Sequence, residues 1–228
     1  RQILMMKRLI KGIAERHGLV ASFMPKPFQD EAGNGLHVHC SVLDREGRNV
    51  FDDGGESGTP ELLHAIAGCL RYMPDSFLLF APSFNGYRRF QKGSHAPTYP
   101  AWGYENRTVA LRVPAGAPVA RRFEHRVAGA DANPYLVLAV ILAAALEGIE
   151  RRLEPPPPVT GDGYSRKGEA ELPIFMQDAL KVFGVSHFIR RALGETMQYT
   201  FAITKEQEIT EFLRHITTME YQTYLQRL

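Results

Sequence analysis

Two histidines and a serine alternate along a short apolar stretch, where they could bind a metal ion or an anionic substrate. The stretch GNGLHVHCSV, residues 33–42, carries His37, His39 and Ser41 at every second position. Successive side chains of a strand point to opposite faces, so these three polar groups share one face and the apolar residues between them face the core. His-x-His is a common metal spacing, and it also fits two solvated histidines on a half-exposed strand.

A carboxylate lies between two arginines in a second stretch with the period of a strand. In RRFEHRV, residues 121–127, Arg122, Glu124 and Arg126 share one face, whereas Phe123, His125 and Val127 point to the other. A guanidinium group binds carboxylate or phosphate oxygens in pairs, so this face suits an anionic substrate. Ordinary charges at a strand edge are the alternative interpretation.

Arginines are concentrated in the middle of the chain, between positions 88 and 126. They are Arg88, Arg89, Arg107, Arg112, Arg121, Arg122 and Arg126. In RTVALRV, residues 107–113, the two arginines fall on opposite faces of the expected strand. The whole chain nevertheless carries 27 basic and 25 acidic residues, a net charge of +2. This balance argues against nucleic acid as the partner and favours a local site for a small anion.

The composition is that of a soluble globular protein. The 228 residues fit one large domain or two small ones, with 44% hydrophobic and 23% charged residues. The two cysteines, Cys40 and Cys69, form no disulfide framework of the secreted type, so a reducing, cytoplasmic location is expected. The longest apolar run, 135–146, is too short to span a bilayer, and no membrane partner is expected.

Apolar periodicity predicts strands in the first half of the chain and helices mainly in the second, which indicates an α+β fold. The expected strands cover residues 19–24, 36–43, 107–113 and 121–127. The expected helices cover about 3–14, 60–71, 134–149, 173–193 and 204–227. The helix behind Asn133 and Pro134 is apolar nearly all round and should be buried. Residues 84–102 have no clean period and predict a long functional loop.

Three segments together resemble the glutamine synthetase superfamily. They are SFMPKPFQDEAGNGLHVHCSVLD, APSFNGYRRFQKGSHAPTYPAWGYENRTVALRVP and RRFEHRVAGADANPYLVLAVILAAALEGI. Their order, spacing and Ala-Asn-Pro-Tyr motif match the family, and the resemblance covers essentially the whole chain. It implies the catalytic domain of an ATP-dependent carboxylate–amine ligase, an α+β fold with a curved, mainly antiparallel sheet backed by helices. In that family ATP phosphorylates the γ-carboxylate of glutamate, and an amine then attacks the acyl phosphate.

The resemblance also implies roles for individual residues. The implied ligands of Mg²⁺ or Mn²⁺ are His37 and Glu124. The implied ATP contacts are His39, Ser41 and Arg112. The implied glutamate contacts are Gly33, Arg89, Arg107 and Arg126, of which Arg89 and Arg107 also serve catalysis together with His95.

The sequence departs from the family pattern at several points. The family's other acidic metal ligands and its small N-terminal β domain would precede Arg1, so residues 1–228 are expected to be a C-terminal catalytic domain without them. One histidine and one glutamate cannot complete an octahedral Mg²⁺ site, so this chain alone is expected to be incomplete or inactive. Val119 replaces a basic residue, and Ala32 replaces an asparagine.

The most informative departure is His95, which stands where glutamine synthetases carry a catalytic glutamate in their flap. That glutamate attracts ammonium, so its loss favours an organic amine whose carbon chain packs against Tyr99, Trp102 or Tyr104. His95, Ala32 and the sequences around them resemble the γ-glutamylpolyamine synthetase (glutamate–putrescine ligase) branch.

The predicted function is therefore ATP-dependent joining of glutamate to an amine, in a ring-type homo-oligomer when the protein is full length. Glutamine synthetase itself, using ammonia, is the alternative within the family. A catalytically silent paralogue that binds nucleotide or only assembles is the alternative outside catalysis. A zinc hydrolase built on His37 and His39 would need a third ligand at metal spacing, which the sequence does not offer.

Overall fold

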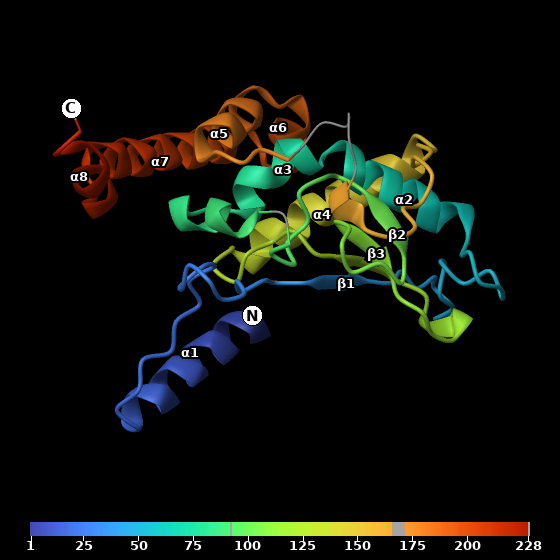
Figure 1. Ribbon diagram of the computed structural model, residues 1–228. Helices are drawn as coiled ribbons and strands as arrows, with labels where there is room; N and C mark the ends of the chain where they lie inside the picture. Colours follow the sequence, from blue (N-terminus) through green and yellow to red (C-terminus); the bar gives the residue numbers. More distant parts are fainter. Residues whose placement is uncertain (92, 166–171, 228) are drawn as a thin grey trace.

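The computed structural model describes residues 1–91, 93–165 and 172–227, shown in Figure 1. The α-helices of these residues are α1 (Gln2–Arg16), α2 (Pro60–Arg71), α3 (Met73–Phe80), α4 (Pro134–Glu150), α5 (Met176–Val185), α6 (His187–Leu193), α7 (Glu195–Arg214) and α8 (Thr218–Tyr224). The strands are β1 (Val38–Cys40), β2 (Trp102–Tyr104), β3 (Leu111–Val113) and β4 (Phe123–His125). Short 3₁₀ helices are η1 (Phe84–Arg89), η2 (Pro118–Ala120) and η3 (Gly163–Ser165).

The four strands form one mixed, mainly antiparallel sheet in the order β1-β4-β3-β2. Strand β4 pairs antiparallel with β1 and β3, whereas β2 and β3 run parallel. The register places His39 and Arg112 opposite Glu124 on its two sides. Because directly opposite side chains in a sheet lie within contact distance, this register gathers three polar groups on one face. The expected α+β class with a mainly antiparallel sheet is confirmed.

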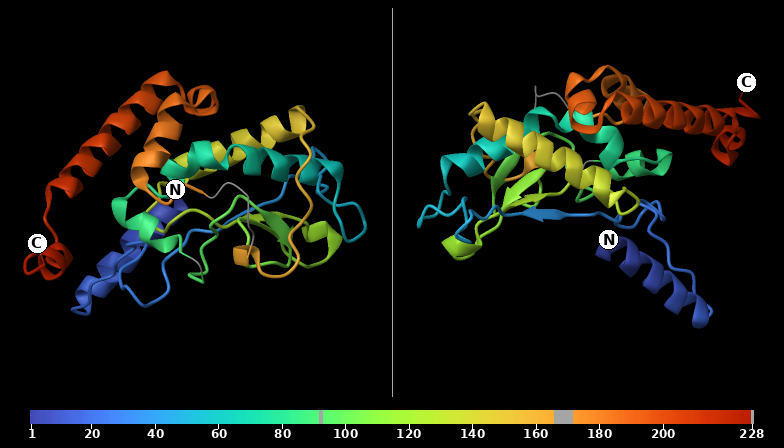
Figure 2. Two further views of the ribbon diagram at one scale, coloured as in Figure 1. Left: turned by 45° about the horizontal axis from the view of Figure 1, so that its top comes forward. Right: turned by 180° about the vertical axis from the view of Figure 1, so that it is seen from behind.

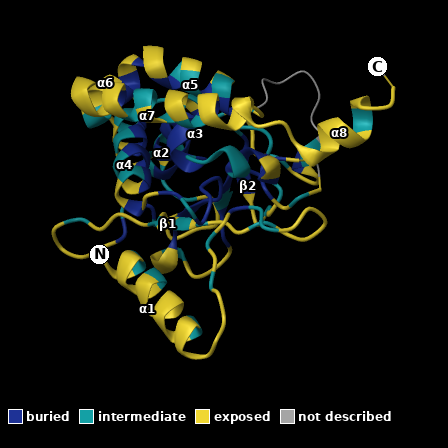
Figure 3. Ribbon diagram, turned by 90° about the vertical axis from the view of Figure 1, so that its left-hand side faces the viewer, coloured by how far each residue is buried: buried dark blue, intermediate teal, exposed yellow. Residues whose placement is uncertain are grey.

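Helices α2, α3 and α4 lie on one side of the sheet (Figures 1 and 2), and within the described part of the chain no such helical layer covers the other side. The core lies between the helices and the sheet, as the dark region of Figure 3 shows, and includes Phe77, Phe123 and Ile141. Helices α2 and α4 meet at two glycines. A Cβ on Gly68 would lie 2.0 Å from the Ala144 carbonyl oxygen, so only glycine permits this approach. The tight crossing holds the helical layer that supports the sheet.

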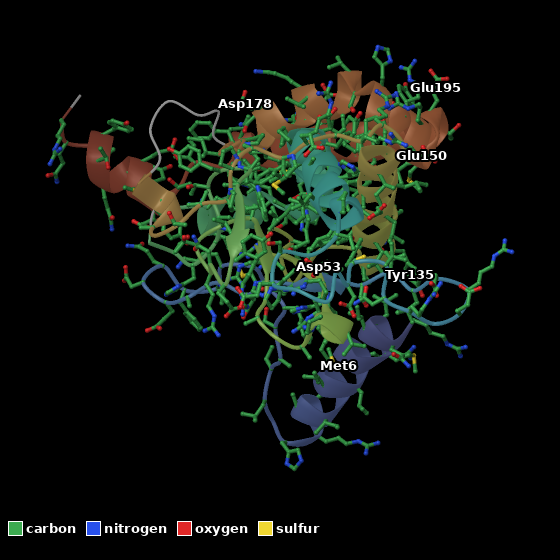
Figure 4. All side chains as sticks on the ribbon, turned by 90° about the vertical axis from the view of Figure 1, so that its right-hand side faces the viewer. Met6, Asp53, Tyr135, Glu150, Asp178 and Glu195 are labelled. Carbon is green, nitrogen blue, oxygen red and sulfur yellow. The ribbon has the colours of Figure 1, made fainter. Side chains whose placement is uncertain are left out.

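The helix that begins behind Asn133 forms as expected, but it is not buried all round. Asn133 caps α4 by accepting a hydrogen bond from the Tyr135 amide. One face packs on the core, while the opposite face of α4 is exposed at Tyr135, Leu138, Leu142 and Leu146. Figure 4 labels Tyr135 at the start of this helix. The prediction that this helix is buried on all sides, made from its apolar sequence, is therefore wrong for one of its faces.

Helix α1 stands away from the body of the molecule and has no buried residue (Figures 1 and 3). Its apolar side chains, including Met6 in Figure 4, are largely exposed. Lys7 nevertheless reaches the body and donates a hydrogen bond to the Ala130 carbonyl.

All four expected strands are absent or shorter in the structure, and the one expected over residues 121–127 is only β4, Phe123–His125. Residues 19–24 form no strand, and Val20 is 97% exposed. The stretch 107–113 is a turn up to position 110 and becomes strand β3 only from Leu111. Strand β1 likewise ends at Cys40, and Val42 beyond its end is exposed.

Cys40 and Cys69 are both free thiols, Cys40 half-buried and Cys69 buried. Among the helices of the described residues, none combines the length and the apolar character needed to span a bilayer.

Candidate active site

Glu124 is the centre of a polar cluster on the uncovered face of the sheet. It lies on β4, between two residues that point the other way into the core, and only 3% of it is exposed. Its Oε1 accepts a hydrogen bond from Arg126 Nη1 at 2.9 Å, and its Oε2 accepts one from Arg112 Nη1 at 3.0 Å. A single buried carboxylate therefore orients two guanidinium groups.

Both arginines are held by further contacts that leave them little freedom. Arg112 Nη2 donates to Glu105 Oε1 at 3.1 Å, and the Ala115 amide donates to the same carboxylate. Arg126 Nη2 donates to the Arg107 carbonyl oxygen at 3.1 Å. Guanidinium groups fixed in this way are pre-organised to bind an anion without paying the full cost of ordering their side chains.

The two histidines of the opening motif also meet Glu124, as their shared face predicted. His37 Nδ1 lies 2.9 Å from Glu124 Oε1, and His39 Nε2 lies 3.7 Å from it. Arg122 Nε donates to His39 Nδ1 at 3.1 Å, so a neutral His39 carries its proton on the nitrogen that faces Glu124. Sequence reasoning placed Arg122 on this face but gave it no role.

The charges of the cluster set the protonation states of its centre. Burial opposes ionisation of Glu124, but the nearby Arg126, His37 and Arg112 outweigh it and hold the pKa of this carboxyl below its usual range. Burial, with Arg126 next, lowers the pKa of His37 despite the attraction of Glu124. Glu124 is therefore anionic and His37 neutral near pH 7, which leaves His37 able to accept a hydrogen bond or ligate a metal.

His125 belongs to the opposite face and takes no part in the cluster. It is 1% exposed, packs its ring 4.6 Å from that of Phe80, and burial lowers its pKa to about 3. It is a neutral core residue.

Arg89 and the loop that runs from Lys26 past Gly33 to Gly35, called the glycine loop below, extend the site beyond Glu124. A Cβ on Gly33 would lie 2.8 Å from Arg89 Cγ, and one on Gly35 would lie 3.1 Å from Arg89 Nη2 and 3.4 Å from His37 Nε2. Gly35 thus lies between the Arg89 guanidinium and the His37 ring. The glycines let the backbone approach both groups, so Arg89, Gly33 and His37 form one continuous surface.

Arg89 is a buried cation with no ion-pair partner among the described carboxylates. Only 5% of it is exposed, and its guanidinium donates from Nη1 to the Val127 carbonyl oxygen at 3.1 Å. Burial lowers its pKa to about 10, with the more distant Asp131 acting in the opposite direction. A guanidinium in this state remains charged near pH 7 and would gain from an anionic ligand.

Three of the predicted site residues are not drawn into the cluster. The Arg107 side chain is exposed, and only its backbone carbonyl contacts the cluster, through Arg126. Ser41 is exposed beyond the end of β1. His95 is exposed in the flap, residues 91–101, with a backbone φ of 62°, a conformation that non-glycine residues adopt rarely. Lys92 of this flap lies outside the described residues.

Two aromatic residues expected near the acceptor amine have other partners. Trp102 is 3% exposed and donates its indole N–H to the Pro156 carbonyl at 2.6 Å. Tyr104 donates its hydroxyl to the Ser57 carbonyl at 2.8 Å. They stabilise loops, and the expectation that they line the acceptor site finds no support in these contacts.

Tyr164 is an aromatic residue that the sequence did not single out. Its hydroxyl is buried and forms no hydrogen bond of standard geometry with a described residue, although the His95 backbone lies near it. Burial raises the pKa of this phenol, and the nearby Arg126 and the His95 backbone oppose that effect. Tyr164 therefore lies near both Arg126 and the backbone of the flap.

The cluster does not by itself form a complete site for a divalent cation. Within residues 1–91, 93–165 and 172–227, no three His, Cys, Asp or Glu side chains are grouped to hold a metal ion. His37 and Glu124 are two suitable donors, but both Glu124 oxygens already accept hydrogen bonds from guanidinium groups. Mg²⁺ requires about six oxygen-rich positions, which this set does not supply.

The arrangement can bind and polarise a substrate that carries several negative charges. Arg89, Arg112 and Arg126 supply donors, and Glu124 fixes two of them. Such an array neutralises charge during transfer of a phosphoryl group, a reaction in which positioning and electrostatics do most of the work.

Comparison with known proteins agrees with this chemistry. Residues 2–224 match the model of the glutamine synthetase catalytic domain. The chain is 43% identical over 222 residues to the γ-glutamylputrescine synthetase PuuA of Escherichia coli, covering 97% of this chain and 47% of the relative. It is 38% identical over 219 residues to the γ-glutamylethanolamide synthetase GlnA4 of Streptomyces coelicolor, covering 96% and 46%.

The solved structures give the same result. The structure titled GmaS/ADP complex has a TM-score of 0.89 at 33% identity, covering 98% of this chain and 53% of that one. The chain thus spans about half the length of the curated relatives it matches. By the match over residues 2–224 and the relatives at about 40% identity, the chain belongs to the glutamine synthetase family.

Proposed function

We propose that the protein carrying this chain joins the γ-carboxylate of glutamate to an organic amine at the expense of ATP. The observation that supports it best is the pair of fixed guanidinium groups on Glu124 next to the unpaired Arg89. Two relatives whose names specify γ-glutamyl amides, one of putrescine and one of ethanolamine, add support. Glutamate, an amine and ATP are the proposed substrates, and a ring-type homo-oligomer is the proposed assembly.

The proposed reaction has two steps. An oxygen of the γ-carboxylate attacks the γ-phosphorus of ATP, the bond to the β-phosphate oxygen breaks, and ADP leaves. The amine nitrogen then attacks the acyl carbon, loses a proton, and displaces phosphate that keeps one former carboxylate oxygen. Charge builds up on the phosphoryl oxygens in both steps, so fixed guanidinium groups lower both barriers.

Each residue has a proposed part in this reaction. Arg89 with the Gly33 loop would bind the glutamate carboxylate, because this guanidinium is buried without a carboxylate partner among the described residues. Arg126 would contact the transferred phosphoryl group, and Arg112, with His39 and Ser41, the nucleotide. Arg107 would reach the phosphoryl group from its exposed turn.

A divalent cation would supply further charge neutralisation at the phosphates when it is bound. We propose His37 and Glu124 as the ligands that this chain contributes to Mg²⁺ or Mn²⁺, with the remaining ligands supplied by the nucleotide and by groups outside the described residues. Binding through Glu124 would require one of its guanidinium contacts to loosen.

His95 is the proposed determinant of acceptor choice. A glutamate at this exposed flap position would place a fixed negative charge beside ammonium, whereas a histidine does not. An organic amine gains affinity from its carbon chain and depends less on that charge.

The amine preference can be measured by phosphate release from the protein at its natural length. Putrescine, ethanolamine, methylamine and ammonium are compared at equal concentration, with wild type and His95→Glu. We expect putrescine or ethanolamine to exceed ammonium by about tenfold or more, and His95→Glu to shift the ratio toward ammonium. If ammonium is preferred and His95→Glu leaves the ranking unchanged, the protein is a glutamine synthetase. Absence of phosphate release with any acceptor would indicate a catalytically silent paralogue.

A further inference from the structure

The 3₁₀ helix η1 carries two side chains that hold the glycine loop from both ends. Asn85 and Arg89 lie four residues apart on this short element. Asn85 contacts the start of the loop at Lys26, and Arg89 contacts its end at Gly33. Because Asn85 and Arg89 both lie on η1, this one element sets the position of the glycine loop relative to the Arg89 side chain.

Asn85 binds the backbone of Lys26 through both halves of its amide. Its Oδ1 accepts from the Lys26 N–H at 2.8 Å, and its Nδ2 donates to the Lys26 carbonyl at 2.9 Å. The two residues are 59 positions apart in the chain. A reciprocal pair of hydrogen bonds fixes both the position and the orientation of the peptide it binds.

The loop is closed on itself between these two contacts. The Asn34 amide donates to the Pro25 carbonyl at 2.8 Å, and the Asn34 side chain donates to the Met24 carbonyl at 2.8 Å. The Lys26 ammonium folds back to the Glu31 carbonyl. A displacement of Lys26 is therefore passed to Gly33, one residue from the closing hydrogen bond.

Little free space separates Gly33 from Arg89. A Cβ on Gly33 would lie 2.8 Å from both Arg89 Cγ and the Pro25 carbonyl oxygen. Tightly packed groups transmit small displacements, so a loop shifted by loss of the Lys26 contact would change the space in front of the Arg89 guanidinium.

The 3₁₀ helix that carries both side chains is itself anchored. Ser83 caps it by accepting from the Gly86 amide and donates to Asp131 Oδ2 at 2.6 Å. The Phe84 ring stacks on Phe212 of α7 with centroids 4.9 Å apart and planes inclined by 3°. These contacts do not involve the glycine loop. They hold η1 in place independently of the loop, so η1 can fix the position of the loop.

We infer that Asn85 is a positioning residue that sets the glycine loop against Arg89 and thereby determines affinity for the carboxylate substrate. The inference builds on the proposed function, because it assigns that substrate to the same surface. Asn85 does not contact the nucleotide side of the cluster, so its effect is specific to the carboxylate substrate.

Asn85→Ala tests the inference in the protein at its natural length. We expect KM for glutamate to rise about tenfold, the effect on an equilibrium constant of losing one or two hydrogen bonds, while KM for ATP changes less than twofold. Asn85→Asp keeps the acceptor for the Lys26 N–H but sets a carboxylate oxygen against the Lys26 carbonyl, so it should also raise KM for glutamate and leave KM for ATP within twofold. Equal changes in both KM values, or no change in either, would overturn the inference.

Gln198→Ala is the matched control. Gln198, on α7, is a buried amide that also donates to backbone carbonyls, those of Phe183 and Ser186 at the C-terminal end of α5, at 2.7 and 3.0 Å. It should lower the melting temperature as Asn85→Ala does and leave both KM values unchanged.

Hydrogen exchange separates this inference from the proposed function. If the wild type releases no phosphate with glutamate and any amine, the proposed function fails, and the loop can still be examined. The Lys26 and Asn34 amides should then exchange at least tenfold faster in Asn85→Ala than in Gln198→Ala. Equal exchange in the two variants would refute the positioning role.

Discussion

Glu124→Gln is expected to lower kcat/KM by roughly 100-fold to 1000-fold, the range seen when one pre-organised electrostatic contact at a reacting centre is lost. The amide keeps the shape of the side chain but removes the charge. Its NH₂ group must then face Arg126 or Arg112, both of which only donate hydrogen bonds. At least one guanidinium group loses its partner and its orientation. Removing one partner of a buried ion pair also costs about 3–5 kcal/mol of stability, so the melting temperature should fall.

Glu147→Gln provides a control with similar contacts away from the site. Glu147 accepts from the Tyr72 hydroxyl at 2.6 Å and pairs with Arg191 at 2.8 Å on the helical side. Glu147→Gln should lower the melting temperature. Its kcat/KM should equal that of the wild type when the assay is run at a temperature at which both variants are folded. Activity of Glu124→Gln within threefold of wild type would contradict the role of Glu124 as the group that orients the arginines.

Arg89→Met is expected to raise KM for glutamate about 100-fold with little loss of stability. A bidentate guanidinium–carboxylate contact contributes about 3 kcal/mol, which corresponds to that factor. In the protein alone, Arg89 is buried without a described carboxylate partner, and replacing such a charge by an apolar side chain of similar size is often neutral or stabilising. The melting temperature should therefore change by no more than a few degrees. Initial rates over a glutamate series, together with thermal unfolding, measure both effects.

Arg88→Met is the matched control, because Arg88 is the exposed neighbour of Arg89 on the same 3₁₀ helix. It should leave both KM values and the melting temperature unchanged. If Arg89→Met unfolds the protein, or raises KM for ATP as much as KM for glutamate, Arg89 is a structural residue and the assignment of the carboxylate site is wrong.

The polar face of the sheet could be predicted from the sequence because side chains of a strand point alternately to its two faces, so each residue has only two possible orientations. Alternation along residues 121–127 puts Glu124 on one face and His125 on the other, and the structure has them so, in contact with Arg126 and Phe80 respectively. The start of α4 was equally clear, because Asn133 and Pro134 are residues with strong preferences at a helix N-terminus.

The strands were harder to predict, because a strand depends on a neighbour as well as on its own composition. Residues 19–24 are of β type but meet no partner strand among the described residues, and they stay irregular. The stretch after Asn106 is a turn because the Asn106 side chain accepts hydrogen bonds from the amide and hydroxyl of Thr108. An Asn two residues before a Thr was a local signal for this turn.

Several site contacts had no usable signal in the sequence. Asn85 and Lys26 are 59 positions apart, and no periodicity connects them. Glu105 reaches Arg112 from an irregular segment with a backbone φ of 49°. Arg122 could have been found, because it lies on the face of Glu124, but its contact with His39 depends on the register between β1 and β4.

The central claim is that glutamate is activated as a γ-glutamyl phosphate, and oxygen transfer tests it most directly. The protein at its natural length is given ATP, an amine, and glutamate labelled with ¹⁸O in both γ-carboxylate oxygens. Mass spectrometry then follows the released phosphate and the amide. Transfer of one carboxylate oxygen per turnover predicts one ¹⁸O in each phosphate and one in each γ-glutamyl amide. Amide formation with unlabelled phosphate would contradict the account, because ATP would then be cleaved without attack by the carboxylate.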